Sequence, residues 1–81
     1  MKMIKEGTLV HIPAAALLQK YNVEDGNTDI VTGWKTFDTP HTLLVSDTNS
    51  IRDHVGVLFQ NEVWYIKKKE VYTIDEEQEN E

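Results

Sequence analysis

Short apolar runs rich in β-branched residues, separated by polar breaks, make up most of this chain. Thr8–Ile12 lies between Gly7 and Pro13, and Thr42–Ser46 is a second run of the same kind. Runs of this length bounded by glycine, proline or polar clusters are typical of β-strands. The pattern therefore predicts a mostly-β domain.

The clearest local pattern is a β-hairpin. Val55–Gln60 and Val63–Lys67 are both strand-like, and only Asn61-Glu62 separates them. A two-residue connection is typical of a tight hairpin, and asparagine tolerates the positive φ that such turns need. Glu62 suits a turn less well than glycine, so a longer loop is an alternative. After this hairpin the sequence predicts a short break over residues 68–70 and a last short strand over residues 71–74.

The segment between residues 14 and 37 departs from the strand pattern. Ala14–Tyr21 is rich in helix-forming residues, with its leucines and tyrosine at helical spacing. A helix here would have about two turns and would need the rest of the fold to stabilise it, so the sequence leaves open whether residues 14–21 are helical. The helix would cap one end of the domain or present its apolar side chains to a partner. Glu24–Asp29 has the composition of a turn, and Ile30–Phe37 predicts a short irregular strand.

In chain order these elements are a strand, a long loop, a strand, a loop, a hairpin, a short break and a short strand. That is the order of a small five-stranded SH3-like barrel. Gly7–Pro13, Leu43–Val45, Val57–Phe59 and Trp64–Tyr72 resemble the small, mostly uncharacterised SH3-like proteins encoded by tailed bacteriophages. The resemblance covers most of residues 5–74 and implies the barrel, and the length of the chain predicts that residues 1–74 form a single domain. The resemblance also implies an accessory protein that binds and modulates a host or phage enzyme, including host defence proteins.

Charge is concentrated at the end of the chain. The net charge is −6, from 14 acidic and 8 basic residues. Residues 75–81 contain no basic and no apolar residue, and their acidic members are Asp75, Glu76, Glu77, Glu79 and Glu81. This composition predicts a disordered acidic tail. The tail is either a solubilising terminus or a peptide that engages a basic groove on a partner.

The sequence also bears on the cellular compartment. It has no cysteine, no apolar run near 18 residues and no signal-peptide pattern at its start. We therefore expect a cytoplasmic protein without membrane association, in the host cytoplasm if the chain is phage-encoded.

The sequence offers little for catalysis or for a cofactor. His11, His41 and His54 are widely spaced and have no cysteine to complete a zinc site. Asp25–Asp29 copies the start of a calcium loop, but glycine and glutamate are missing at its sixth and twelfth positions. Residues 46–54 contain serine, aspartate and histidine without a glycine-flanked nucleophile elbow. We expect no enzymatic activity, no metal and no cofactor.

Large aromatic side chains are numerous for so small a core. In a regular strand, one of Trp64 and Tyr65 would point to solvent. Exposed aromatic residues on a rigid scaffold are frequent anchors of protein interfaces, although the same residues could fill the core. We predict Trp34, Phe37, Trp64 and Tyr65 as contact residues of a non-enzymatic protein-binding module that modulates or inhibits a host enzyme.

Two other functions are alternatives. Trp64, Tyr65 and Lys67–Lys69 place aromatic rings beside positive charge, which could bind single-stranded nucleic acid by stacking and phosphate contact. The lysines do not form one stripe along a regular strand, and the other interpretation is that they protect an exposed strand end. A third hypothesis is a protein that sequesters a small ligand, a nucleotide or a signalling metabolite, at an oligomer interface where a histidine or Arg52 converges. The sequence leaves the partner and the oligomeric state open.

Overall fold

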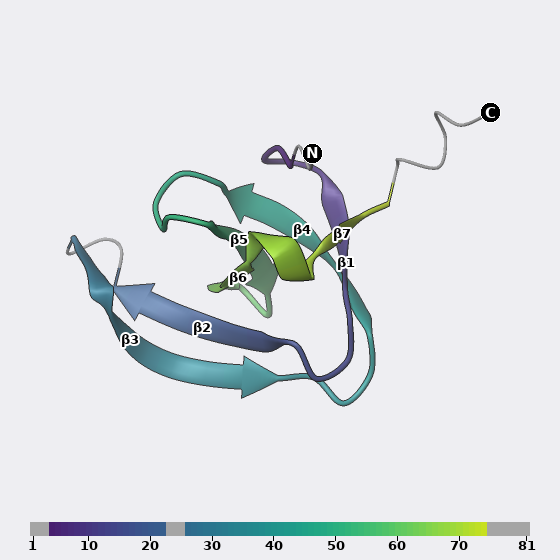
Figure 1. Cartoon of the computed structure of the whole chain (residues 1–81), viewed down its shortest axis with the longest axis horizontal. Helices are drawn as coiled ribbons and strands as arrows, with labels where there is room; N and C mark the ends of the chain where they lie inside the picture. Colours follow the sequence, from purple (N-terminus) through teal and green to yellow (C-terminus); the bar gives the residue numbers. More distant parts are fainter. Residues whose placement is uncertain (1–3, 23–25, 75–81) are drawn as a thin grey trace.

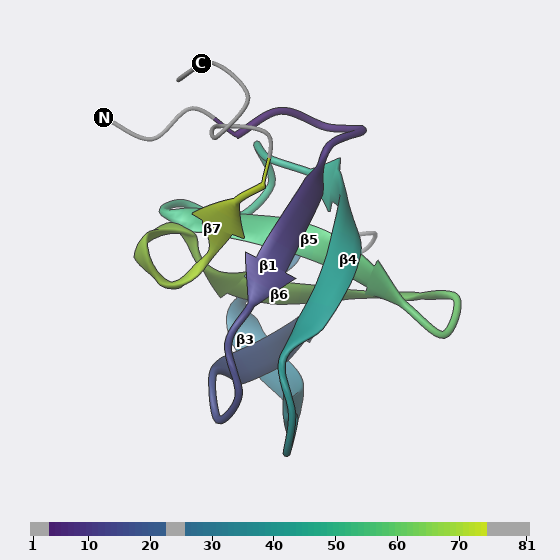
Figure 2. The ribbon, with the colours of Figure 1, turned by 90° about the vertical axis from the view of Figure 1, so that its right-hand side faces the viewer.

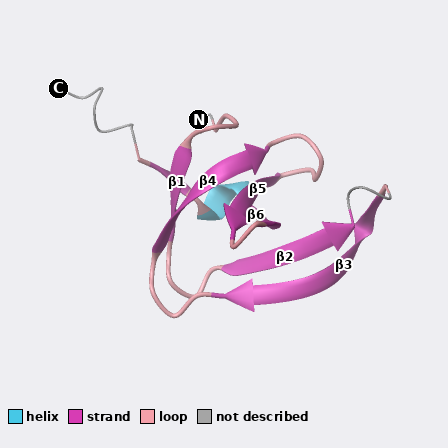
Figure 3. Ribbon diagram, turned by 180° about the vertical axis from the view of Figure 1, so that it is seen from behind, coloured by secondary structure: helices cyan, strands magenta, loops and turns pink. Residues whose placement is uncertain are grey.

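The computed structural model describes residues 4–22 and 26–74, and most of them lie in β-strands or in the turns between strands (Figure 1). In chain order the strands are β1 (Leu9–Ile12), β2 (Leu17–Asn22), β3 (Asn27–Thr36), β4 (His41–Asp47), β5 (His54–Phe59), β6 (Glu62–Lys67) and β7 (Tyr72–Thr73). A 3₁₀ turn, η2 (Lys68–Glu70), precedes β7 and is the short helical segment in Figure 3. The described part has no α-helix, so the mostly-β prediction is confirmed.

The seven strands form one antiparallel sheet in the order β3-β2-β6-β5-β4-β1-β7. The sheet curves strongly, so that β1 and β4 lie across β5 and β6 when seen from the side (Figure 2). No pairing within the described residues joins the outermost strands, β3 and β7, and the sheet is therefore not closed. This differs from the expected five-stranded barrel, because the predicted long first loop is largely the β2–β3 hairpin. The predicted acidic tail and residues 23–25 lie outside the described part.

The possible short helix over Ala14–Tyr21 does not form. Ala15 has a φ of 70° in a turn, and β2 begins two residues later. Leu17 is exposed and Leu18 is fully buried, which is the alternation of a strand. Two helical turns are unstable alone, whereas as a strand this segment pairs with β3 on one side and with β6 on the other. Long-range pairing therefore overrides the local helix propensity.

The β5–β6 hairpin is confirmed, with its turn one residue earlier than predicted. Phe59 pairs with Glu62, so that Gln60 and Asn61 form the turn. Their φ angles are 53° and 67°, and left-handed backbone at both central residues is what a type I′ hairpin turn requires. The predicted break over residues 68–70 is confirmed as η2.

The core lies inside the curve of the sheet. Its fully buried side chains are Val10, Ile12, Leu18, Val45, Val55, Val57, Ile66 and Val71. They come from five of the strands and from the residue after η2, and they pack with Trp64 and Phe37 in one cluster. The other face of each strand points away from this cluster, and the candidate site lies on that outer face. No helix in the described part is long and apolar enough to cross a membrane.

Candidate functional site

One cross-strand row on the outer face of the sheet is apolar. Leu9 on β1 pairs with Leu44 on β4, Leu44 pairs with Leu58 on β5, and Leu58 pairs with Val63 on β6. Directly paired residues place their side chains on the same face. The exposed fractions of the three leucines are 52%, 39% and 37%, and Val63 is half-buried. These four residues are called the apolar row.

Strand alternation places these leucines outside the core. In β4, Val45 is buried and Leu44 is exposed, and in β5 the same holds for Val57 and Leu58. A single exposed leucine is ordinary on a protein surface, but neighbours in register form a continuous patch of the kind that marks interaction sites. This row was not predicted from the sequence. Adjacent apolar pairs such as Leu43-Leu44 were its only sign, because one member of each pair must face outward in a regular strand.

The four aromatic residues predicted as contacts do not share a surface. Trp34 on β3 is 63% exposed, whereas Phe37, Trp64 and Tyr65 are only 6%, 8% and 4% exposed. Trp64 belongs to the core cluster. Tyr65 lies on the opposite face of β6, where Tyr21 and Asp47 contact it. The expectation that one of these two points to solvent is wrong, because both faces of β6 are covered at this position. Only Trp34 is placed where a partner could reach it directly.

Tyr65 is held by Asp47 and by Tyr21. Its hydroxyl donates a hydrogen bond to Oδ2 of Asp47 at 2.6 Å, and the Tyr21 ring meets it edge-on with centroids 5.7 Å apart. The backbone N–H groups of Asn49 and Ser50 donate to the other carboxylate oxygen at 3.0 and 3.2 Å. The network ties β6 to the loop that follows β4.

These contacts shift the pKa of both partners. Partial burial acts to raise the pKa of Asp47, but hydrogen bonds from Ser50, Tyr65 and two backbone N–H groups outweigh it and hold the pKa below its ordinary value. Burial raises the pKa of Tyr65 well above its ordinary value, and the hydrogen bond to Asp47 and the negative charge there add to the effect. At neutral pH the pair is therefore a neutral phenol donating to a carboxylate.

Removing the Tyr65 hydroxyl is expected to lower the free energy of unfolding. It should also make that free energy less dependent on pH in the acidic range. Tyr65→Phe deprives Asp47 of one donor and should lower the free energy of unfolding at neutral pH by about 1–2 kcal/mol. Because the folded-state pKa of Asp47 is lowered, its contribution is present above the unfolded value of about 3.9 and is lost as pH falls through the folded value. The variant should therefore lose less stability than the wild type between about pH 5 and pH 2.

Urea unfolding at several pH values, followed by tryptophan fluorescence, measures this effect. The matched control is Tyr21→Phe, because the Tyr21 hydroxyl donates to the Gln19 amide oxygen at 3.0 Å and not to a carboxylate. The control should keep the acid dependence of the wild type. An unchanged acid dependence in Tyr65→Phe would contradict the role given to this hydrogen bond.

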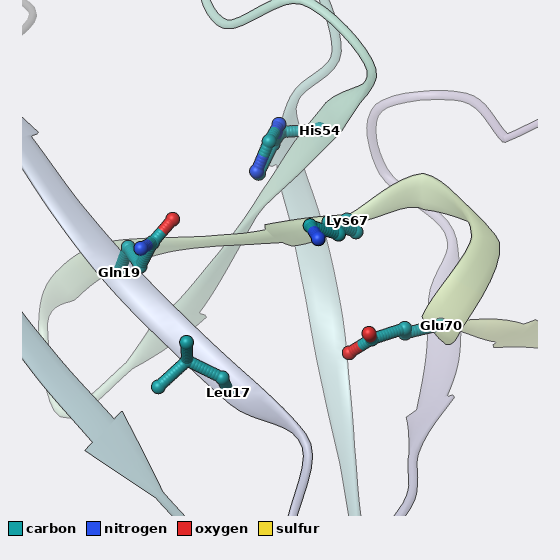
Figure 4. Close-up of a pocket in the computed structure, with 5 residues that line it drawn as sticks. All are labelled: Leu17, Gln19, His54, Lys67 and Glu70. Atoms are coloured by element: carbon teal, nitrogen blue, oxygen red, sulfur yellow. The ribbon is translucent and has the colours of Figure 1, made fainter. Parts of the chain in front are cut away.

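A small pocket lies between the start of β2 and the end of β6 (Figure 4). Its lining residues are Leu17, Gln19, His54, Lys67 and Glu70. Nδ1 of His54 is 2.8 Å from the Arg52 carbonyl oxygen; since a carbonyl only accepts, Nδ1 carries the hydrogen. Lys67 and Glu70 bring opposite charges to the rim. Arg52, expected near a nucleotide, is not among the lining residues, so the pocket lacks the concentrated positive charge that phosphates favour.

The three histidines lie in separate places. His11 lies beside Tyr72, His41 stacks on Phe37 with centroids 3.9 Å apart, and His54 lies near Tyr21. No group of three or more potential metal-ligating side chains occurs among residues 4–22 and 26–74. The structure therefore brings together no histidine cluster that could hold a metal in this part of the chain.

The polar stretch between β4 and β5 is organised as a turn. Asp47 accepts hydrogen bonds from the side chain and the backbone of Ser50, and His54 bonds to a backbone carbonyl. The hydroxyl of Ser46 is buried without a hydrogen-bond partner. None of these bonds joins a serine to His54, so the residue types of a triad are present without its geometry.

The lysines and the aromatic rings proposed for nucleic-acid binding do not form one surface. Lys67–Lys69 are exposed at the end of β6 and in η2, whereas Trp64 and Tyr65 are buried. Stacking with a base requires an accessible ring face. In this arrangement these two rings offer no stacking platform.

Comparison with protein-family models finds no match, and neither curated proteins nor solved structures give a significant match to this chain. The apolar row and the exposed ring of Trp34 are therefore the features on which a functional proposal can rest.

Proposed function

We propose that this protein is a non-enzymatic protein-binding module and that the apolar row is its contact surface. The observation that carries the proposal is the exposure of Leu9, Leu44 and Leu58 in register across three neighbouring strands. Each Å² of apolar surface removed from water contributes about 25 cal/mol, so a partner that covers this row gains a continuous apolar anchor. Such buried anchors carry much of the binding energy in protein interfaces.

We also propose the class of partner, a host enzyme or defence protein that this chain modulates or inhibits in the bacterial cytoplasm. The resemblance to phage-encoded SH3-like proteins supports this part of the proposal. The order of elements supports the SH3-like assignment, because β1, β4, β5, β6, η2 and β7 follow one another as the strands and the 3₁₀ turn of such a barrel do. The β2–β3 hairpin then takes the position of the long first loop.

Leu44→Gln is expected to lose the partner while the fold is kept. Its control is Thr42→Gln, since Thr42 is exposed on the same face of the same strand. We expect one bacterial protein to be captured from lysate by the wild type and by the Thr42 variant. Capture by the Leu44 variant should fall about tenfold, which corresponds to about 1.4 kcal/mol. Mass spectrometry identifies the protein, and urea unfolding confirms that both variants fold.

Equal capture by Leu44→Gln and by the wild type would remove the apolar row as the contact surface. No capture of any protein in a bacterial lysate by the wild type would count against the proposed partner class.

A further inference from the structure

Strand register brings the side chains of the pocket in Figure 4 to the outer face of β2, β5 and β6. His54 pairs with Lys67, and Gln19 pairs with Tyr65. Directly paired residues, and residues two apart in one strand, place their side chains on the same face. Continuing the Gln19–Tyr65 register along β2 places Leu17 opposite Lys67. The pocket therefore collects side chains from three strands, and the last residue of η2 completes its rim.

The pocket holds one positive and one negative charge that are not paired. Lys67 and Glu70 both line it, and neither forms an ion pair with any residue in 4–22 or 26–74. A ligand with a single charge would be attracted by one of these groups and repelled by the other. A ligand that carries both signs can interact favourably with both groups. The charges of the pocket therefore suit a zwitterion better than a simple anion or cation.

Two uncharged polar groups of the pocket match the same kind of ligand. The Oε1 atom of Gln19 accepts a hydrogen bond from the Tyr21 hydroxyl at 3.0 Å, so the amide nitrogen remains as a donor. Nδ1 of His54 bonds to the Arg52 carbonyl at 2.8 Å, so Nε2 is the acceptor nitrogen of the neutral ring. The first group can donate to a carboxylate, and the second can accept from an ammonium group.

The size of the pocket limits the ligand. Its volume is about 130 Å³, and an apolar cavity of about 150 Å³ in another protein holds benzene, which has six non-hydrogen atoms. A ligand that fits should therefore have about six non-hydrogen atoms as well. Leu17 gives the pocket an apolar wall, which suits a short alkyl group on the ligand.

From these observations we infer that the pocket binds a small zwitterion, a free amino acid of about the size of alanine. Lys67 and the Gln19 amide bind its carboxylate. Glu70 and Nε2 of His54 bind its ammonium group, and its methyl group lies against Leu17. The site is separate from the apolar row, and the inference does not depend on the proposed protein partner.

Titration of the full chain with three ligands of nearly equal size tests this inference. L-Lactate has a hydroxyl group where L-alanine has its ammonium group, and L-alaninamide has an amide in place of the carboxylate. Amide signals of the pocket residues in nuclear magnetic resonance spectra report binding. Because the site is open to solvent, we expect a dissociation constant of about 1 mM for alanine. Each analogue should bind about tenfold more weakly, since one charged group of the pocket loses its partner.

Two charge-neutralising variants test the assigned contacts. Lys67→Gln and Glu70→Gln should each weaken alanine binding about tenfold. Lys67→Gln should no longer distinguish alanine from alaninamide, and Glu70→Gln should no longer distinguish alanine from lactate. The matched control is Lys69→Gln, because Lys69 is an exposed lysine of η2 that does not line the pocket. It should bind alanine as the wild type does, and urea unfolding confirms that all three variants fold.

The possible results separate the parts of the inference. Equal binding of alanine and either analogue by the wild type would overturn the zwitterion. Unchanged alanine binding by Lys67→Gln or by Glu70→Gln would overturn the contact given to that residue. Absence of any shift of the pocket signals at a large excess of alanine would overturn the whole inference. The proposed function is tested by lysate capture and is not affected by these results.

Discussion

Trp64→Ala is expected to lower the free energy of unfolding by about 3–5 kcal/mol, whereas Trp34→Ala should cost less than about 1 kcal/mol. Trp64 packs in the core cluster, and Trp34 is mostly exposed on the outermost strand β3. Typical native proteins are stable by only about 5–15 kcal/mol, so the first change removes a large part of the total. Urea unfolding followed by far-ultraviolet circular dichroism measures both without relying on the altered tryptophans.

The position of Trp64 explains why the effect should be large. Its ring lies under Gly33 of β3, and the ammonium groups of Lys20 and Lys35 lie 5.2 and 5.8 Å from the ring centroid. These neighbours come from β2 and β3, so the Trp64 ring packs between the β2–β3 hairpin and β6. Its removal should loosen the hairpin as well as leave a cavity.

Trp64→Phe distinguishes the effect of losing most of the side-chain volume, as in Trp64→Ala, from the effect of losing only the indole N–H group. The indole N–H of Trp64 is buried without a hydrogen-bond partner, and an unsatisfied buried donor is itself unfavourable. The phenylalanine variant removes that donor and keeps an aromatic ring, so it should be clearly more stable than Trp64→Ala. Similar destabilisation by Trp34→Ala and Trp64→Ala would contradict the assignment of one ring to the surface and the other to the core.

The difference in burial between Trp34 and the other three aromatic residues decides which alanine variants can be used to measure binding. An alanine at Phe37, Trp64 or Tyr65 removes a buried side chain, so weaker binding by such a variant could reflect unfolding. Trp34→Ala should remain folded. It therefore tests whether the β2–β3 hairpin contributes to the contact surface together with the apolar row.

The sequence was most informative where structure is determined locally. The β5–β6 hairpin follows from two strand-like runs and a short polar connection, and Asn61 adopts the left-handed backbone that its side chain tolerates. The strand at residues 41–47 and the break at residues 68–70 have similarly local origins. The helix-forming composition of Ala14–Tyr21 did not reveal its strand, because its pairing with β3 and β6 depends on residues ten or more positions away.

The candidate site could be predicted only in part, because both of its main features depend on strand register. Trp64 and Tyr65 alternate as residues of a strand should, but the curved sheet covers both of their faces. The apolar row exists because Leu9, Leu44 and Leu58 fall opposite one another in three strands. A shift of one residue in β4 would bury Leu44 and expose Val45, and composition alone does not specify that register.

Gly56→Ala is expected to lower the free energy of unfolding by about 1–3 kcal/mol through overpacking. A Cβ atom at this position would lie 2.8 Å from Cγ1 of Val63, 3.0 Å from Cε2 of Tyr65 and 3.1 Å from Cβ of Asp47. These neighbours belong to β6 and β4, the two strands between which β5 is paired. The added methyl group therefore has no direction in which to move away, and the neighbouring strands must shift.

The matched control is Gly33→Ala, because the nearest atom to a Cβ at Gly33 is 3.7 Å away and that contact is ordinary. This control should change the free energy of unfolding by less than about 1 kcal/mol, and the loss of glycine flexibility in the unfolded chain favours the folded state of the variant.

Because the alanine at 56 presses on Tyr65 and Asp47, it should also weaken their 2.6 Å hydrogen bond and reduce the dependence of stability on acidic pH. The alanine also presses on Val63, which belongs to the apolar row. Equal stabilities of the two variants in urea would show that the sheet has room at Gly56 and would contradict the tight packing described for this face.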